Sequence, residues 1–203
     1  VYEAKMVQAY DHRAASVVVE EENWVRQGQK QEASEAQHQN PEHLALPRFW
    51  TDATAVEARF DGNPPRSGMI GFKDITSPTN ERTMIAAFLP WVAVVNSAPL
   101  LFPDEAIAPR RECCVLANLN SFVLDYVARQ KVGGLHLNFF IVEQLPTLRP
   151  DTYADKCPWS PTERCWSAIR AESSAFAAGS PRLMPARAAW PGKPIARGRT
   201  RTR

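Results

Sequence analysis

The chain has 203 residues, of which 44% are hydrophobic and 23% are charged, and its formal net charge is +2. This length and composition suit one packed domain of ordinary size, with room for a modest tail. The sequence has neither the run of about 18 apolar residues that a membrane-spanning helix needs nor the apolar stretch of a signal peptide. Its four cysteines lack the CxxC spacing of zinc sites. We therefore expect a soluble cytoplasmic protein with no membrane partner and no metal.

Charge and apolar content both change near Pro150. Acidic residues outnumber basic ones in residues 1–150, whereas Lys and Arg outnumber Asp and Glu in residues 151–203. Ile, Leu and Val are common in the first part and scarce in the second, which cannot bury enough apolar area to offset its ordering entropy. We expect a domain over residues 1–150. Residues 151–203 form a low-complexity Arg/Ala/Pro tail that we expect to be disordered or translated in a shifted frame, with one short helix around Thr162–Ala178.

Hydrophobic patterning predicts strands and helices in alternation along residues 1–150. The polar stretch from Glu20 to Pro47 indicates a long loop or an exposed helical insertion. The predicted strands are residues 2–8, Ala15–Val19, Met69–Ile75, Val92–Val95, Leu100–Phe102 and Leu135–Leu145. This order of elements favours a mixed α/β or α+β fold, a small domain built on a mixed sheet.

Two helices are predicted in the same domain. Ser77 followed by Pro78 is typical of a helix start, so we expect a helix over Thr79–Leu89. A long amphipathic helix is expected from about Glu112 to Lys131, because apolar residues recur there at the 3.6-residue period and two glycines follow. The residues expected to face the core from this helix are Val115, Leu116, Leu119, Phe122, Val123, Tyr126 and Val127.

Three short motifs carry polar or nucleophilic residues, and each lacks the partners that catalysis requires. Residues 63–65, Asn-Pro-Pro, resemble the catalytic loop of amino-group DNA methyltransferases, but Arg66 replaces the aromatic residue and no Gly-rich cofactor loop is present. The adjacent side chains of residues 11–13, Asp-His-Arg, point to different sides of an extended chain, and Cys113 and Cys114 have no His nearby in the sequence. We therefore predict no catalytic residues in this chain.

Several stretches, taken in order, resemble the region that follows the catalytic domain in Eco57I-like adenine-specific DNA methyltransferases of type II restriction–modification systems. The first is Tyr-Glu-Ala-Lys-Met at residues 2–6 with Tyr-Asp-His-Arg at residues 10–13, and the second runs from Gly71 to Ala87. The third comprises residues 119–131, 136–138 and 142–146. Each stretch alone is a weak signal, but the ordered set, which spans roughly residues 2–150, is fairly specific.

This resemblance implies a target-recognition region that binds double-stranded DNA and helps to select the adenine that is methylated at N6. S-adenosylmethionine would be the cofactor of the parent enzyme, held by a methyltransferase domain that this chain lacks and that would be its partner. The sequence departs from the family at Ala4, where Gly is usual, and the family-like character stops after about Trp159. We therefore expect a truncated piece of a larger enzyme.

Ten residues are candidates for DNA contact, because recognition requires donors to phosphates and groups that reach base edges. One set surrounds the expected helix start at Ser77, a second flanks the glycines at 133–134, and a third lies in the first family-like stretch. In this order they are Lys73, Thr76, Asn80 and Arg82; Arg129, Lys131, His136 and Asn138; and Lys5 and Arg13. For the first two sets the alternative is an ordinary exposed position on a helix or turn. For Lys5 and Arg13 the alternative is contact with the missing catalytic domain.

Two other functional hypotheses remain open from the sequence. The chain could be a non-functional gene remnant that folds poorly, which its basic, apolar-poor tail would explain. It could instead be a small stand-alone enzyme of unknown reaction, for which tight binding of S-adenosylmethionine by this chain alone would be the sign.

Overall fold

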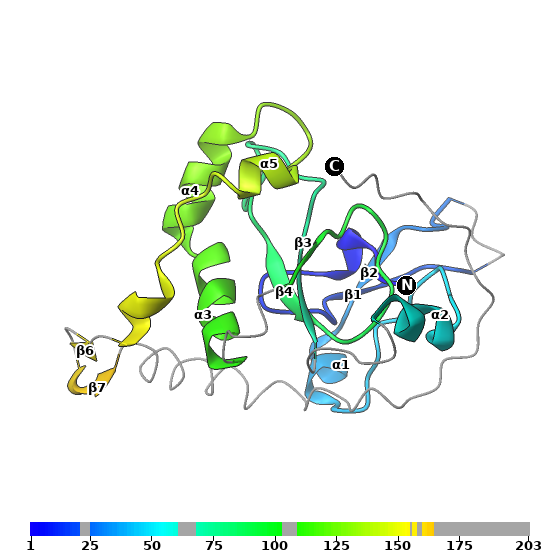
Figure 1. Ribbon diagram of the computed structural model, residues 1–203. Helices are drawn as coiled ribbons and strands as arrows, with labels where there is room; N and C mark the ends of the chain where they lie inside the picture. The colour runs from blue at the N-terminus through cyan, green and yellow to red at the C-terminus, as the bar shows by residue number, and fades with distance from the viewer. Residues whose placement is uncertain (21–24, 61–67, 103–108, 155, 158–159, 165–203) are drawn as a thin grey trace.

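The computed structural model describes residues 1–20, 25–60, 68–102, 109–154, 156–157 and 160–164 (Figure 1). It contains both helices and sheets, which confirms the predicted mixed class. The strands are β1 (Ala15–Val17), β2 (Lys30–Glu32), β3 (Met69–Phe72), β4 (Ala86–Leu89), β5 (Leu100–Leu101), β6 (Lys156–Cys157) and β7 (Ser160–Arg164). The α-helices are α1 (Glu35–Gln39), α2 (Ala53–Glu57), α3 (Pro109–Leu119), α4 (Phe122–Lys131) and α5 (Phe139–Val142). The 3-10 helices are η1 (Ala4–Met6), η2 (Ala58–Phe60) and η3 (Pro150–Ala154).

A three-stranded antiparallel sheet in the order β4-β3-β5 forms the centre of the domain. Figure 1 shows α3 and α4 on one side of this sheet, with the N-terminal segment and β1 on the other. Strands β1 and β2 form a separate antiparallel pair, as do β6 and β7. Among the described residues the named strand pairs are thus antiparallel, and the single parallel pairing is the isolated bridge between Tyr2 and Val94.

The sheet separates two hydrophobic clusters, and β4 contributes to both. Ala86 and Phe88 belong with the cluster under α3, α4 and α5, whereas Ala87 and Leu89 belong with the cluster formed by the N-terminal segment. Successive side chains of a strand point to opposite faces, so this alternation follows directly from an extended backbone. Both faces of β4 are therefore covered.

The predicted helix over Thr79–Leu89 is wrong, because its second half is strand β4. A continuous apolar run suits a strand buried on both faces as well as it suits a buried helix, and periodicity alone cannot separate the two. The expected helix start is a turn instead, in which the Asn80 N–H donates to the Ser77 carbonyl over 3.1 Å. The expected phosphate site at a helix N-terminus is consequently not formed at Ser77.

The predicted single helix from Glu112 to Lys131 is divided into α3 and α4. The break falls at Asn120 and Ser121, and the Ser121 hydroxyl caps α4 by accepting a hydrogen bond from the Leu124 N–H. Because of the break, the residues of α4 that face the core are not the ones that a single continuous helix would bury. Leu116, Leu119 and Leu124 are buried, whereas Phe122, Val123 and Tyr126, expected in the core, are exposed.

Other element boundaries also differ from the predictions. The expected strand over Leu135–Leu145 contains the short helix α5, which follows the isolated bridge between Ile75 and His136. Residues 2–8 hold η1 rather than a strand, and the polar stretch from Glu20 to Pro47 includes β2 and α1. Beyond the expected boundary at Pro150, Tyr153 is buried against α3. The expected helix around Thr162–Ala178 begins in strand β7, and its remainder lies outside the described residues.

The side chain of Asn120 completes the outer edge of β4. Its Oδ1 accepts from the Ala86 N–H at 3.0 Å, and its Nδ2 donates to the Ala86 carbonyl at 2.8 Å. Asn120 is only 4% exposed. It therefore replaces a neighbouring strand at a position where unpaired backbone groups would be costly.

Replacing Asn120 should destabilise the fold. We predict that Asn120→Ala lowers the free energy of unfolding by about 2–3 kcal/mol, because the buried Ala86 N–H loses its acceptor. Urea denaturation monitored by tryptophan fluorescence measures the change. Asn138→Ala, at an exposed position with no side-chain capping bond, is the matched control and should stay within about 0.5 kcal/mol of the parent. Equal effects of the two variants would contradict the assigned role of Asn120.

Candidate nucleic-acid interface

A buried carboxylate, Asp125 on α4, holds the loop that leads into β4. Its Oδ1 accepts from the N–H groups of Thr83 and Met84, each at 2.8 Å, and its Oδ2 accepts from Arg129 at 3.1 Å. Arg82 completes the set with Nε 3.4 Å from Oδ1. Burial acts to raise the pKa of Asp125, but these donors and cations outweigh it and hold the pKa below its ordinary 3.8.

Two of the predicted DNA contacts, Arg82 and Arg129, bind the protein itself. Arg129 donates to the carbonyls of Pro78 and Glu81 as well as to Asp125. Arg82 donates to the Asn120 carbonyl, and its guanidinium lies 4.7 Å from the centroid of the Phe122 ring. These arginines fasten the loop to α4, which leaves few of their donors for a phosphate.

Thr76 and Arg13, also predicted as DNA contacts, are buried. The Thr76 hydroxyl donates to the Thr83 carbonyl at 2.8 Å, within the same loop. The Arg13 guanidinium donates to the carbonyls of residues 38, 40 and 43, and thereby ties the segment after α1 to the N-terminal turn. Both side chains bind backbone carbonyls of the folded protein, and the charge and spacing of residues in the sequence cannot reveal such contacts.

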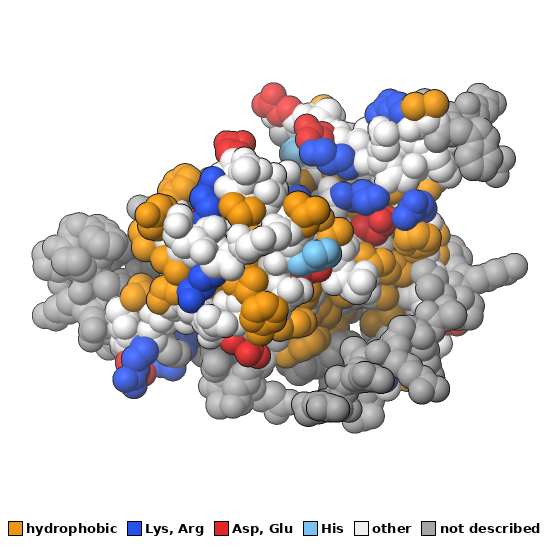
Figure 2. Space-filling view, turned by 90° about the horizontal axis from the view of Figure 1, so that it is seen from above, with side chains coloured by type: hydrophobic (Ala, Val, Ile, Leu, Met, Phe, Trp, Pro, Cys, Tyr) orange, Lys and Arg blue, Asp and Glu red, His pale blue; other side chains and the backbone are white. Residues whose placement is uncertain are grey.

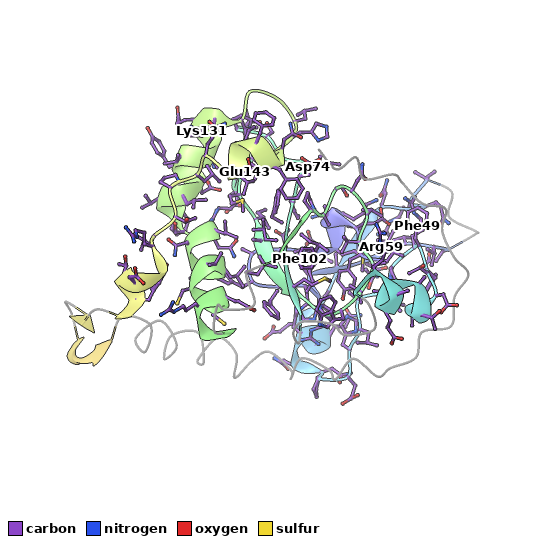
Figure 3. All side chains as sticks on the ribbon, in the orientation of Figure 1. Phe49, Arg59, Asp74, Phe102, Lys131 and Glu143 are labelled. Carbon is purple, nitrogen blue, oxygen red and sulfur yellow. The ribbon has the colours of Figure 1, made fainter. Side chains whose placement is uncertain are left out.

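The candidates Asn80, Lys131, His136 and Asn138 lie on the surface. The His136 ring is 2.9 Å from the Asp74 carboxylate, and Lys131 donates to Gln144 over 3.3 Å. Figure 3 shows Lys131 and Asp74 toward the end of the molecule where α5 lies. The side chains of Asn80 and Asn138 have no hydrogen bond among the described residues.

The same end of the molecule exposes many apolar side chains. Figure 2 shows hydrophobic side chains spread over this face, with basic ones scattered among them. They include Ile75, Tyr126, Leu135, Phe139 and Phe140, which are between 48% and 66% exposed. A surface for phosphates needs clustered cations, so this end suits DNA less well than the lysines described next.

A hollow of about 240 Å³ lies between the N-terminal turn and the β1–β2 pair. Its charged lining includes Lys5, Lys30, Asp11 and Glu32, and His38 lies 3.0 Å from Asp11. Pockets for small molecules usually exceed about 300 Å³. This hollow has the size for one phosphate group rather than for a nucleotide cofactor.

The two lysines of the hollow both have partners within the protein. Lys5 Nζ donates to the Gly28 carbonyl at 2.6 Å and lies 3.2 Å from Glu3, while Lys30 Nζ lies 2.6 Å from Glu32. The Lys30–Glu32 pair is solvent-exposed, and such pairs contribute about 0–1 kcal/mol. The Lys30–Glu32 pair therefore adds little to the stability of the fold.

Lys73 brings a further positive charge close to Lys30. It follows β3, whereas Lys30 belongs to β2, and within the described part of the chain no carboxylate is in ion-pair distance of Lys73. Burial, and then the charge of Lys30, lower the pKa of Lys73. Lys5 and Lys73, both predicted from the sequence, are thus partly buried lysines, and Lys30 is an exposed lysine that sequence reasoning missed.

Comparison with known proteins finds no match for this chain among protein-family models, curated proteins or solved structures. Among the described residues, no group of three or more His, Cys, Asp or Glu side chains could hold a metal ion. No helix in the described part is long and apolar enough to cross a membrane.

The lowered pKa of Asp125 predicts a specific acid sensitivity. A depressed carboxylate pKa stabilises the fold above the ordinary value of 3.8, and this contribution is lost as the pH falls from about 5 through the lower folded-state pKa. We predict that Asp125→Asn costs about 3 kcal/mol at neutral pH. The difference from the parent should shrink below about pH 4.

Urea denaturation at a series of pH values measures this difference. Asp151→Asn, whose side chain is 78% exposed, is the control and should follow the parent at every pH. A constant difference between Asp125→Asn and the parent from neutral pH to pH 3 would contradict the assignment.

Proposed function

We propose that this chain is the DNA-binding target-recognition part of an adenine-specific (N6) DNA methyltransferase of the restriction–modification type. In this proposal a separate domain binds S-adenosylmethionine and transfers the methyl group, and this chain positions the double-stranded DNA. The proposal starts from the three family-like stretches in the sequence. Their arrangement in the fold supports it.

The observation that carries the proposal is the convergence of these stretches on Ala86. Ala86 belongs to the second stretch, and its N–H and carbonyl are both bound by Asn120 of the third. The same carbonyl accepts from the N–H of Tyr10, in the first stretch, at 3.0 Å. Stretches that are far apart in the sequence thus build one packed unit, as a shared folded domain requires.

Lys5 and Lys30, which line the hollow, and Lys73, whose pKa is lowered in part by the charge of Lys30, supply the positive charge that DNA binding requires. Lys5, Lys30 and Lys73 come from three separate segments, and phosphate contacts of this kind fix the position of a protein on the duplex. Base selection would then come from other side chains on the same face. The remaining family-like charges, Arg82, Arg129 and Asp125, hold the scaffold together.

Salt-dependent DNA binding tests the proposal. We expect the full chain to bind a mixed-sequence duplex in fluorescence anisotropy, with an affinity that falls steeply as salt rises. Lys30→Gln combined with Lys73→Gln should reduce the slope of log K against log salt by about 2, because each phosphate contact contributes about 0.9.

The matched control is Arg59→Gln combined with Arg149→Gln, which removes the same charge from two exposed side chains outside the hollow. If the control variant and the lysine variant have the same slope of log K against log salt, DNA binding depends only on the net charge of the chain and not on these lysines. Absence of DNA binding by the parent, or tight binding of S-adenosylmethionine by the chain alone, would reject the proposal.

A further inference from the structure

The outward face of α4 carries apolar side chains where a surface helix usually carries polar ones. The buried residues of α4 lie on one side of the helix, and Val123, Tyr126 and Gln130 lie on the other. Steps of three and four residues place these three side chains on one stripe. Val123 is 77% exposed and Tyr126 is 65% exposed, and the neighbouring Phe122, at 79%, widens the stripe. The polar face expected of an amphipathic surface helix is therefore missing here.

A second group of exposed apolar side chains adjoins the end of α4. Lys131, in the last turn of α4, donates to Gln144, and Gln144 donates to the Phe140 carbonyl of α5. Figure 1 shows α5 beside the upper part of α4. The side chains of Phe139 and Phe140 are 48% and 59% exposed. The two helices therefore expose apolar side chains next to each other.

The exposed aromatic area of these helices is comparable to the apolar part of a dimer interface. An aromatic side chain has an area of about 150–250 Å², so the exposed parts of the four rings on α4 and α5 amount to about 500 Å². A standard interface covers about 800 Å² on each partner, and about 65% of a homodimer interface is apolar. Val123, Ile75 and Leu135, which are also exposed, add to this area.

The charges on α4 favour a second copy of the chain, with the two helices antiparallel. The stripe of Val123, Tyr126 and Gln130 is uncharged, whereas a nucleic acid requires cations. Antiparallel helices oppose their dipoles favourably. If they cross near Tyr126, their Lys131 residues are about 14 Å apart along the helix axis. This separation exceeds the screening length of about 8 Å at physiological salt, so the two ammonium groups do not repel each other strongly.

We propose that two copies of this chain associate through the outward faces of their α4 helices, which lie antiparallel across a two-fold axis near Tyr126. In such an interface each contact occurs twice. Val123 of one copy faces Gln130 of the other, and the two Tyr126 side chains meet near the axis. This inference is independent of the proposed function, because the association requires no DNA.

Sedimentation velocity of the full chain without DNA tests the association. We expect a reversible equilibrium between one and two copies, with a dissociation constant in the micromolar range. Tyr126→Glu should raise this constant at least about a hundredfold, because two carboxylates would meet near the axis. Val25→Glu adds the same charge at a residue that is 86% exposed and lies outside α4, so this control should associate like the parent.

A charge pair tests the antiparallel arrangement. Val123→Glu alone should raise the dissociation constant at least about tenfold, because it buries an unpaired carboxylate in the interface. Adding Gln130→Lys to the same chain should return the constant to within about threefold of the parent, because opposite charges then face each other between the copies. Within one chain the two positions are about 10 Å apart along the helix, too far for an ion pair. A melting curve of each variant shows whether it folds, and Tyr126→Ser is measured if Tyr126→Glu does not.

Each outcome supports or rejects the proposal. A parent chain that remains a single copy at all micromolar concentrations rejects it, and the face is then left for a different protein partner. Association that Tyr126→Glu leaves unchanged, or that Val25→Glu weakens equally, places the contact outside α4 and also rejects it. Failure of Gln130→Lys to restore association in the Val123→Glu chain rejects the antiparallel arrangement.

Discussion

The Asp125 carboxylate, which accepts the N–H groups of Thr83 and Met84, is the interaction on which the rest of the fold depends. These two residues begin the segment that becomes β4, so Asp125 sets where the strand starts and how it lies against α4. Ala86 lies two residues after Met84, and the Asn120 side chain binds both its N–H and its carbonyl. The side chains of Asp125 in α4 and of Asn120, which lies between α3 and α4, thus bind the backbone of this segment as a neighbouring strand would.

This clamp explains why three charged residues of the family-like stretches, Asp125, Arg82 and Arg129, bind one another. A buried carboxylate is stable only when it is paired and hydrogen-bonded, and Arg82 and Arg129 meet that requirement. The same arginines cross-link the 78–83 loop to α4. The proposed function therefore assigns DNA contact to side chains that the clamp leaves outside it, Lys5 and Lys30 of the hollow.

The sequence predicted the parts of the fold that local patterns determine. The β-strand over Met69–Phe72, the apolar segment around Leu116–Leu119 and the end of α4 near Lys131 follow from continuous apolar runs, helical periodicity and a following glycine pair. The predictions failed where a distant side chain decides the outcome. Residues 86–89 are strand because two cores cover them, and the helix breaks after Leu119 because Asn120 bonds to β4.

The candidate site could be predicted only in part for the same reason. Lys5 and Lys73 were predicted from their place in the family-like stretches. Lys30 was missed because it lies in a polar segment that carries no motif. Arg13 and Thr76 were indistinguishable in the sequence from surface donors, although tertiary contacts bury both.

Native-state hydrogen exchange at the Thr83, Met84 and Ala86 amides tests the central claim most directly, because these N–H groups are the ones that Asp125 and Asn120 hold. The account predicts that all three exchange only through global unfolding, with the same free energy of opening. Exchange of these amides at the rates of an unfolded chain, in a protein whose β3 amides remain protected, would contradict it.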